Sequence, residues 1–131
     1  MGRAQSRESV FKLIFEFCMN KEKDEELFNE ILSEAKDEAS YITTLYEGVI
    51  DKYDELCEDI SKNIKNFSFD RIFKVDLAIL LVALYEIKYM KNIPDAVSVN
   101  EAVKLSKIYS TEKSYSYING VLSNFVKDKN V

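Results

Sequence analysis

The amino-acid sequence predicts an all-α fold. Glycine occurs 3 times and proline once in 131 residues, and both residues are typical of turns and hairpins. Apolar residues recur at helical spacing along the chain, beginning with Val10, Leu13, Ile14 and Phe17. No segment alternates apolar and polar residues as a half-buried strand does. The length is that of a single domain.

Four amphipathic helices are predicted in the first half of the chain. The first extends from about Ser6 to Met19. Apolar positions from Leu27 to Ala35 indicate the second helix, and those from Ile42 to Tyr53 indicate the third. The fourth follows the stripe from Leu56 to Ile64 and is expected to end near Asn66.

The second half begins with a predicted helix cap at Ser68, followed by Asp70 and Arg71 in the first helical turn. Residues 77–87 are apolar on nearly every side, which indicates a buried central helix. The sequence Asn-Ile-Pro-Asp at 92–95 then breaks this helix.

Two more helices are expected after this break. Ser98 and Glu101 have the spacing of a capping box, so one helix is predicted from Ser98 to about Ile108. Ser110 or Thr111 is predicted to cap the last helix. The core stripe of the last helix is predicted to be Tyr115, Ile118, Leu122 and Phe125.

Charge is distributed unevenly along the sequence. Residues 22–59 hold 14 acidic and 3 basic residues, a net charge of −11, whereas the remainder holds 9 acidic and 15 basic residues, a net charge of +6. This asymmetry predicts a polyanionic partner on the basic side. The alternative for residues 22–59 is an acidic, solvated surface without a partner.

Composition argues against catalysis and against a membrane protein. The chain has no histidine, the commonest general base and metal ligand. Cys18 and Cys57 are far apart and lack a CxxC spacing, so neither a metal site nor a disulfide is predicted. The longest apolar run, Leu77–Tyr85, is too short to cross a bilayer, and no secretory signal is visible. We therefore expect a cytoplasmic protein with no cofactor and no enzymatic activity.

Several motifs resemble the NusB family of transcription antitermination factors. They cover about half of the chain, from Phe69 to Phe125, in the family's order and spacing. At the N-terminus, the arginine-rich run of the family is represented by Arg3, Arg7 and Glu8. The motifs are FDRIFKVDLAIL at 69–80, ALYE at 83–86, Ile93-Pro94, VNEAV at 99–103 and INGVL at 118–122.

The resemblance implies two small packed helical bundles within one domain, at about residues 1–66 and 67–131. It also implies an RNA-binding adaptor that recognises boxA-type single-stranded RNA of ribosomal RNA transcripts. The implied partners are NusE, a small-subunit ribosomal protein, and the antitermination complex of RNA polymerase. The alternative is a helical protein–protein interaction module that has lost RNA binding.

Candidate RNA contacts lie at the N-terminus and near the C-terminus. Arg3 and Arg7 begin the first helix, where free N–H groups and guanidinium groups suit phosphate. Lysines and tyrosines interleave between residues 104 and 117, as on surfaces that bind single-stranded RNA. With positions implied by the resemblance, the predicted set is Arg3, Arg7, Lys12, Phe15, Lys107, Tyr109, Lys113, Tyr117 and Asn119.

Some of these residues have a structural alternative. Periodicity alone places Phe15 in the core, and spacing alone leaves Tyr109 and Tyr117 undecided between the core edge and the ligand face. Tyr115 falls on the apolar stripe and is assigned to packing, whereas Tyr117 lies about 100° from Ile118. Asn119 is expected either to orient the loop at Tyr109 or to contact RNA.

Acidic residues have two interpretations as well. The resemblance implies that Asp70 and Asp76 face the NusE partner, and each carboxylate would also stabilise a helix N-terminus. Glu86 and Glu101 are interpreted as capping or core-bracing residues. Gly120 lies inside the last predicted helix, so we expect the backbone of another helix or of a partner to approach closely there, and helix–helix packing is the favoured interpretation.

Overall fold

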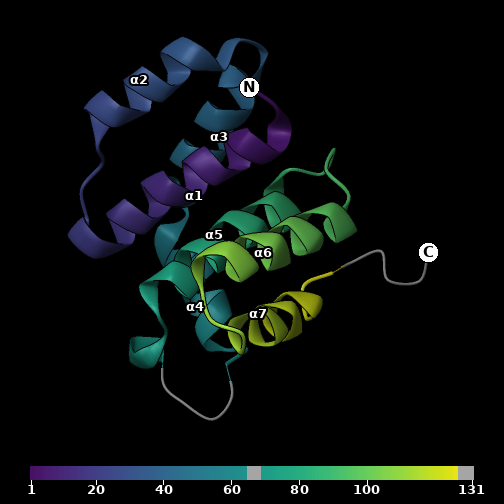
Figure 1. Cartoon of the computed structure of the whole chain (residues 1–131). Coiled ribbons are helices and arrows are strands. Elements are labelled where there is room, and N and C mark those ends of the chain that lie inside the picture. The colour runs from purple at the N-terminus through teal and green to yellow at the C-terminus, as the bar shows by residue number, and fades with distance from the viewer. Residues whose placement is uncertain (65–68, 127–131) are drawn as a thin grey trace.

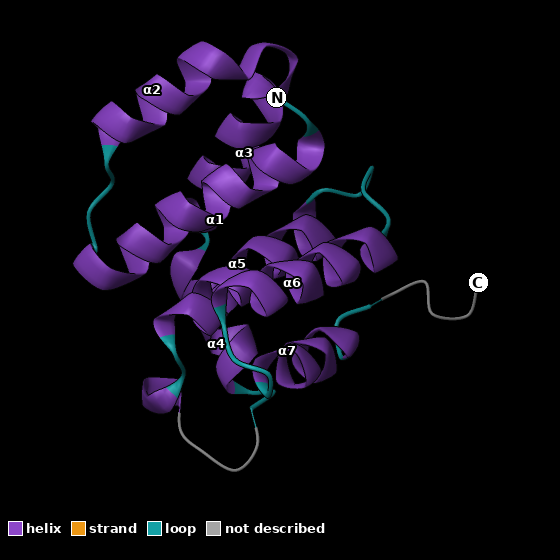
Figure 2. Ribbon diagram, in the orientation of Figure 1, coloured by secondary structure: helices purple, strands orange, loops and turns teal. Residues whose placement is uncertain are grey.

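The computed structural model describes residues 1–64 and 69–126, and all regular structure in these ranges is helical (Figures 1 and 2). Two short 3₁₀ helices, η1 (Lys36–Glu38) and η2 (Phe69–Arg71), accompany the α-helices. The predicted all-α fold is confirmed. The α-helices are α1 (Arg3–Asn20), α2 (Glu25–Ala35), α3 (Ala39–Asp51), α4 (Tyr53–Ser61), α5 (Lys74–Tyr89), α6 (Asp95–Tyr109) and α7 (Ser114–Ser123).

Helix α5 lies at the centre of the fold, in contact with α1, α3, α4, α6 and α7. Every side chain from Leu77 to Leu84 is buried. A helix that is apolar on all sides needs neighbours on every face, and the surrounding helices provide them. The buried apolar side chains of the described residues form one cluster. The predicted buried central helix is therefore confirmed.

The helices form two packed groups (Figure 1). Helices α1, α2 and α3 lie together in the upper part of the view, and α5, α6 and α7 lie below them. Helix α4 contacts both α3 and α5, so it joins the two groups. This agrees with the predicted pair of helical bundles. The predicted division near residue 66 falls at 65–68, outside the described residues, and stays a prediction.

Helix boundaries in the first half differ from the prediction by a few residues. Helix α1 begins at Arg3 instead of Ser6, and Lys21 ends it in the left-handed conformation, with φ of 62°. Asp24 caps α2 by accepting the backbone N–H of Leu27 at 3.0 Å. The chain turns at Lys52, so Tyr53, predicted to end the third helix, instead begins α4.

The serine caps predicted in the second half are wrong where the structure describes them. Helix α6 begins directly after Pro94, whose ring disfavours helical backbone in the preceding residue, and Ser98 lies inside this helix. Helix α7 begins at Ser114 rather than after Ser110 or Thr111. The hydroxyls of Ser98 and Ser110 bind carboxylates on α5 instead. The predicted cap at Ser68 lies outside the described residues, and Asp70 and Arg71 belong to η2.

The close approach of another helix predicted at Gly120 is also wrong. This glycine is exposed, and a Cβ built there would meet nothing within 4 Å. The close approach occurs at Gly48 in α3, where a Cβ would lie 2.2 Å from Cζ of Tyr85 on α5. The close contact that favours glycine therefore lies between α3 and α5 and not in α7.

We predict opposite effects of alanine at the two glycines. Gly120→Ala should raise the free energy of unfolding by about 0.5–1 kcal/mol, because alanine favours a helix interior. Gly48→Ala should lower it, because overpacking costs about 1–3 kcal/mol and exceeds the gain in helix propensity. Urea unfolding followed by circular dichroism measures both changes. A stabilised Gly48→Ala variant would show that the Tyr85 ring moves aside without cost.

Candidate nucleic-acid interface

Arg7 lies in the interior of the protein. Its Nε donates to Oε2 of Glu86 at 2.8 Å, and its Nη2 donates to Oε1 at 3.2 Å. Nη1 also lies 3.5 Å from a carboxylate oxygen of Glu101. The Arg7 side chain is only 4% exposed, so the expectation that its guanidinium group contacts phosphate is corrected. Burial alone would lower the pKa of Arg7, but the hydrogen bond and charge of Glu86 raise it.

Glu86 is the acceptor at the centre of this buried network. Besides Arg7 of α1, it accepts the hydroxyl of Tyr41 from α3 and that of Ser98 from α6, the latter at 2.6 Å. The carboxylate is fully buried, and a buried charge requires such partners. The predicted core-bracing role of Glu86 is confirmed. Arg7 thereby positions α1 against α5 and α6.

Arg3, in contrast, lies at the surface. Its Nε donates to Oε1 of Glu38 at 2.7 Å, and its guanidinium carbon lies 4.0 Å from the ring centroid of Tyr41. The hydrogen bond from Arg3 lowers the pKa of Glu38. A phosphate group that binds Arg3 must therefore either displace the Glu38 carboxylate or bind next to it.

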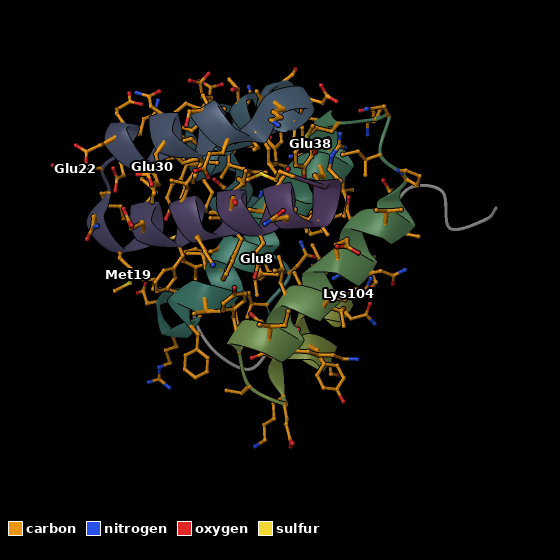
Figure 3. All side chains as sticks on the ribbon, turned by 45° about the horizontal axis from the view of Figure 1, so that its top comes forward. Glu8, Met19, Glu22, Glu30, Glu38 and Lys104 are labelled. Atoms are coloured by element: carbon orange, nitrogen blue, oxygen red, sulfur yellow. The ribbon has the colours of Figure 1, made fainter. Side chains whose placement is uncertain are left out.

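Helix α1 contacts the end of α6 through Tyr109, and two of the predicted RNA-binding residues, Lys12 and Tyr109, lie at this contact. The Tyr109 hydroxyl donates to Glu8, a residue visible on α1 in Figure 3. The Tyr109 ring lies 5.1 Å from that of Phe11, and the Lys12 ammonium lies 5.7 Å from the Tyr109 ring centroid. Lys12 is exposed, whereas Phe15 is half-buried against the core. The structure thus brings Lys12 and Tyr109 together, with Lys12 facing solvent.

Lys113 and Tyr117 line a cavity of about 720 Å³ between η2, the start of α5 and the α6–α7 turn. Phe73, 61% exposed, lines the same cavity. The hydroxyl oxygen of Tyr117 is buried. Burial, with a smaller contribution from the charge of Asp76, raises the pKa of Tyr117 to about 12. Lys113 is exposed, while Tyr117 is directed partly into the protein.

Asp76 also lines this cavity, although its side chain is almost fully buried. One carboxylate oxygen accepts the hydroxyl of Ser110 at 2.6 Å, and the other accepts that of Ser114 at 2.9 Å. The expectation that Asp76 faces a partner protein is corrected, because its side chain is 4% exposed and holds the α6–α7 turn. Asp70 in η2 is exposed and stays a candidate for that interface.

A groove of about 640 Å³ between α6 and α7 holds Lys107 and Asn119. It also contains Tyr115, which the sequence assigned to the core. This assignment is wrong, because α7 begins at Ser114 and buries Ser114, Ile118, Val121 and Leu122. Tyr115 falls at the edge of this stripe and is exposed, with the Lys107 ammonium 5.1 Å from its ring centroid.

Part of the acidic segment lies on one side of the molecule, whereas Glu55 and Asp59 of α4 lie elsewhere and pair with Lys88 of α5. Figure 3 shows Glu22, Glu30 and Glu38 along the side of the molecule formed by α2 and η1, and Lys104 on α6 across α1 from them. Of the predicted RNA residues, Lys12, Lys107, Lys113 and Asn119 are exposed on α1, α6, α7 and the turn before α7. Arg3 lies apart from them, beside the acidic residue Glu38.

Among the described residues, no group of acidic residues and cysteines is arranged to hold a metal ion. In the same part of the chain, no helix is both long enough and apolar enough to cross a membrane.

Comparison with known proteins identifies the class of this domain. The model of the NusB family matches residues 4–127, and the chain belongs to the NusB family. The transcription antitermination protein NusB of Finegoldia magna is 41% identical over 132 residues, covering 98% of this chain and 96% of the relative. The transcription antitermination protein NusB of Clostridium novyi is 37% identical over 136 residues, covering 97% of this chain and 99% of the relative.

Solved structures support the same assignment. NusB of T. maritima superposes with a TM-score of 0.88 at 29% identity, covering 98% of this chain and 92% of that chain. A chain in a crystal structure of the antitermination factors NusB and NusE with double-stranded RNA gives a TM-score of 0.81 at 26% identity. The coverage is 95% of this chain and 97% of that chain.

The two N-terminal arginines should differ sharply in their effect on stability. Arg7→Met should lower the free energy of unfolding by about 3–5 kcal/mol, because it leaves a buried carboxylate without its cationic partner. Arg3→Met should change it by about 0–1 kcal/mol, because the Arg3–Glu38 pair is at the surface. Urea unfolding of both variants measures the difference. Equal, small effects would contradict the buried position of Arg7.

Proposed function

We propose that this protein is an RNA-binding adaptor for transcription antitermination in the bacterial cytoplasm. It recognises boxA-type single-stranded RNA of ribosomal RNA transcripts together with the ribosomal protein NusE. The main support is the similarity, over 95% of this chain, to a chain in the structure of NusB and NusE with double-stranded RNA. The adaptor tethers the transcript to the RNA polymerase complex and has no catalytic step of its own.

The exposed lysines support an RNA-binding surface. Lys12, Lys107 and Lys113 are exposed, and each lies near an aromatic side chain or a lined cavity. Lysines follow the phosphate backbone, and aromatic rings receive unstacked bases. Because Arg7 is buried and Arg3 is paired with Glu38, the N-terminal arginines add little free positive charge. We therefore propose weak RNA binding by the protein alone and stronger binding with NusE.

Asp70 is the proposed direct contact for the basic partner NusE. Asp70 is exposed in η2, and the exposed side chain of Phe73, three residues later, lines the neighbouring cavity. Asp76 acts indirectly, since its bonds to Ser110 and Ser114 shape the turn that lines this cavity.

A second candidate is a protein–protein interaction module that binds no RNA. The observation in its favour is the state of the two N-terminal arginines, one buried and one neutralised. The acidic surface of residues 22–59 would then be the main interface. RNA binding decides between the two functions.

Fluorescence anisotropy of a labelled boxA-type RNA tests the proposed function. We expect binding that tightens when NusE is added and weakens between 50 and 200 mM salt, about the range over which counterion release lowers affinity. Lys12→Gln should reduce the slope of log affinity against log salt by about 0.7, the value for one phosphate contact on a single strand. Lys62→Gln, which removes an exposed lysine beside Glu58 on α4, is the matched control.

One result would contradict this function, and another would contradict only the proposed position of its RNA surface. Binding of NusE without any RNA binding would favour the interaction module. RNA binding with the same salt slope in the wild type, Lys12→Gln and Lys62→Gln proteins would leave the RNA surface somewhere other than at α1.

A further inference from the structure

We propose that the groove between α6 and α7 is a nucleotide-binding site in which an RNA base stacks on Tyr115. This inference rests on the proposed function and specifies where one nucleotide of the RNA binds. The sequence predicted Tyr109 and Tyr117 as the aromatic RNA contacts. In this groove Tyr115, two positions before Tyr117, takes the stacking role instead.

Accessibility distinguishes the three tyrosines near the end of α6 and the start of α7. The Tyr109 ring lies against Phe11 and its hydroxyl is bound to Glu8. Tyr117 is half-buried, and its hydroxyl oxygen is buried. Tyr115 is 41% exposed. Stacking requires an accessible ring, so Tyr115 meets this requirement best.

The polar side chains of the groove match a nucleotide. Asn100 and Asn119 provide amide donors and acceptors of the kind that pair with base edges. Lys107 lies beside the Tyr115 ring and provides positive charge for a phosphate group. One nucleotide could therefore use the ring for its base and a lysine for its phosphate.

Glu101 is the carboxylate among the described residues that line this groove, and its charge is already balanced. One oxygen lies 3.1 Å from Lys104 Nζ, and the other lies 3.5 Å from Arg7 Nη1. The groove is therefore not repulsive to an anion. By contrast, the cavity at η2 is lined by the apolar side chains of Ile72 and Phe73, which suit a protein partner better.

The groove also lies within reach of the other candidate contacts. Lys107 and Tyr109 are about 200° apart around α6, on opposite flanks of its last turn. Ile108, which is 66% exposed, lies between them. A strand that crosses this last turn would contact Lys12 and Tyr109 on the α1 side and Tyr115 on the α7 side.

The test is RNA binding by full-length variants in the presence of NusE, with anisotropy as the readout. Tyr115→Ala should weaken binding roughly 5- to 150-fold, the equivalent of one base–aromatic stack of about 1–3 kcal/mol. Tyr115→Phe keeps the ring and should bind as the wild type does. Tyr89→Ala is the matched control, because Tyr89 is 40% exposed and has the Lys88 ammonium 5.5 Å from its ring, but lies beside Glu55.

A second readout locates the base directly. RNAs with 2-aminopurine at successive boxA positions should show a fluorescence change on binding at one or two positions. This change should be lost in Tyr115→Ala and kept in Tyr115→Phe. Circular dichroism establishes that the variants are folded, as expected for a substitution at an exposed side chain.

Each contrary outcome has a separate meaning. If the wild type binds RNA and Tyr115→Ala binds equally well, the inference fails and the proposed function stands. If the wild type binds no RNA even with NusE, both fail. An equal loss in Tyr89→Ala would overturn the inference, as would a loss of NusE binding in Tyr115→Ala with unchanged binding of RNA alone.

Discussion

The buried carboxylate of Glu86 is the interaction on which the arrangement of the helices depends. It lies on the central helix α5 and accepts hydrogen bonds from Arg7, Tyr41 and Ser98, which belong to α1, α3 and α6. A charge in the interior is unfavourable unless it is paired and hydrogen-bonded. The carboxylate therefore favours the one packing in which all three donors reach it, and that packing sets α1 beside α6.

Asp76 is a second buried carboxylate on α5, near the other end of the helix, and it also accepts hydrogen bonds from residues that follow α6 in the chain. The two carboxylates are ten residues apart in the sequence, about 15 Å along a helix. Glu86 binds Ser98 near the start of α6, and Asp76 binds Ser110 directly after its end. Helix α6 is thus fixed to α5 at both ends. The groove between α6 and α7 and the α1–α6 contact at Tyr109 both depend on this fixed helix.

Apolar periodicity was sufficient to predict the helices and the buried central helix, because both depend on local spacing. The sequence motifs were sufficient to predict the family. Neither was sufficient for the polar network, because Arg7 and Glu86 are 79 residues apart in the sequence. One signal was present: Arg7 shares a helix face with Phe11, Ile14 and Cys18, which predicts burial. Ile118 and Leu122 were predicted correctly as core residues of α7, but Tyr115 was assigned to the core although its neighbour Ser114 occupies the buried position.

The most direct test of this account is a double-mutant cycle between Arg7 and Glu86. The free energy of unfolding is measured by urea denaturation for Arg7→Met, Glu86→Leu and the double variant. The account predicts that the double variant loses at least about 2 kcal/mol less than the sum of the single losses, because neither charge is left buried alone. Additive losses would contradict it, since they would mean that the two side chains do not stabilise each other in the interior.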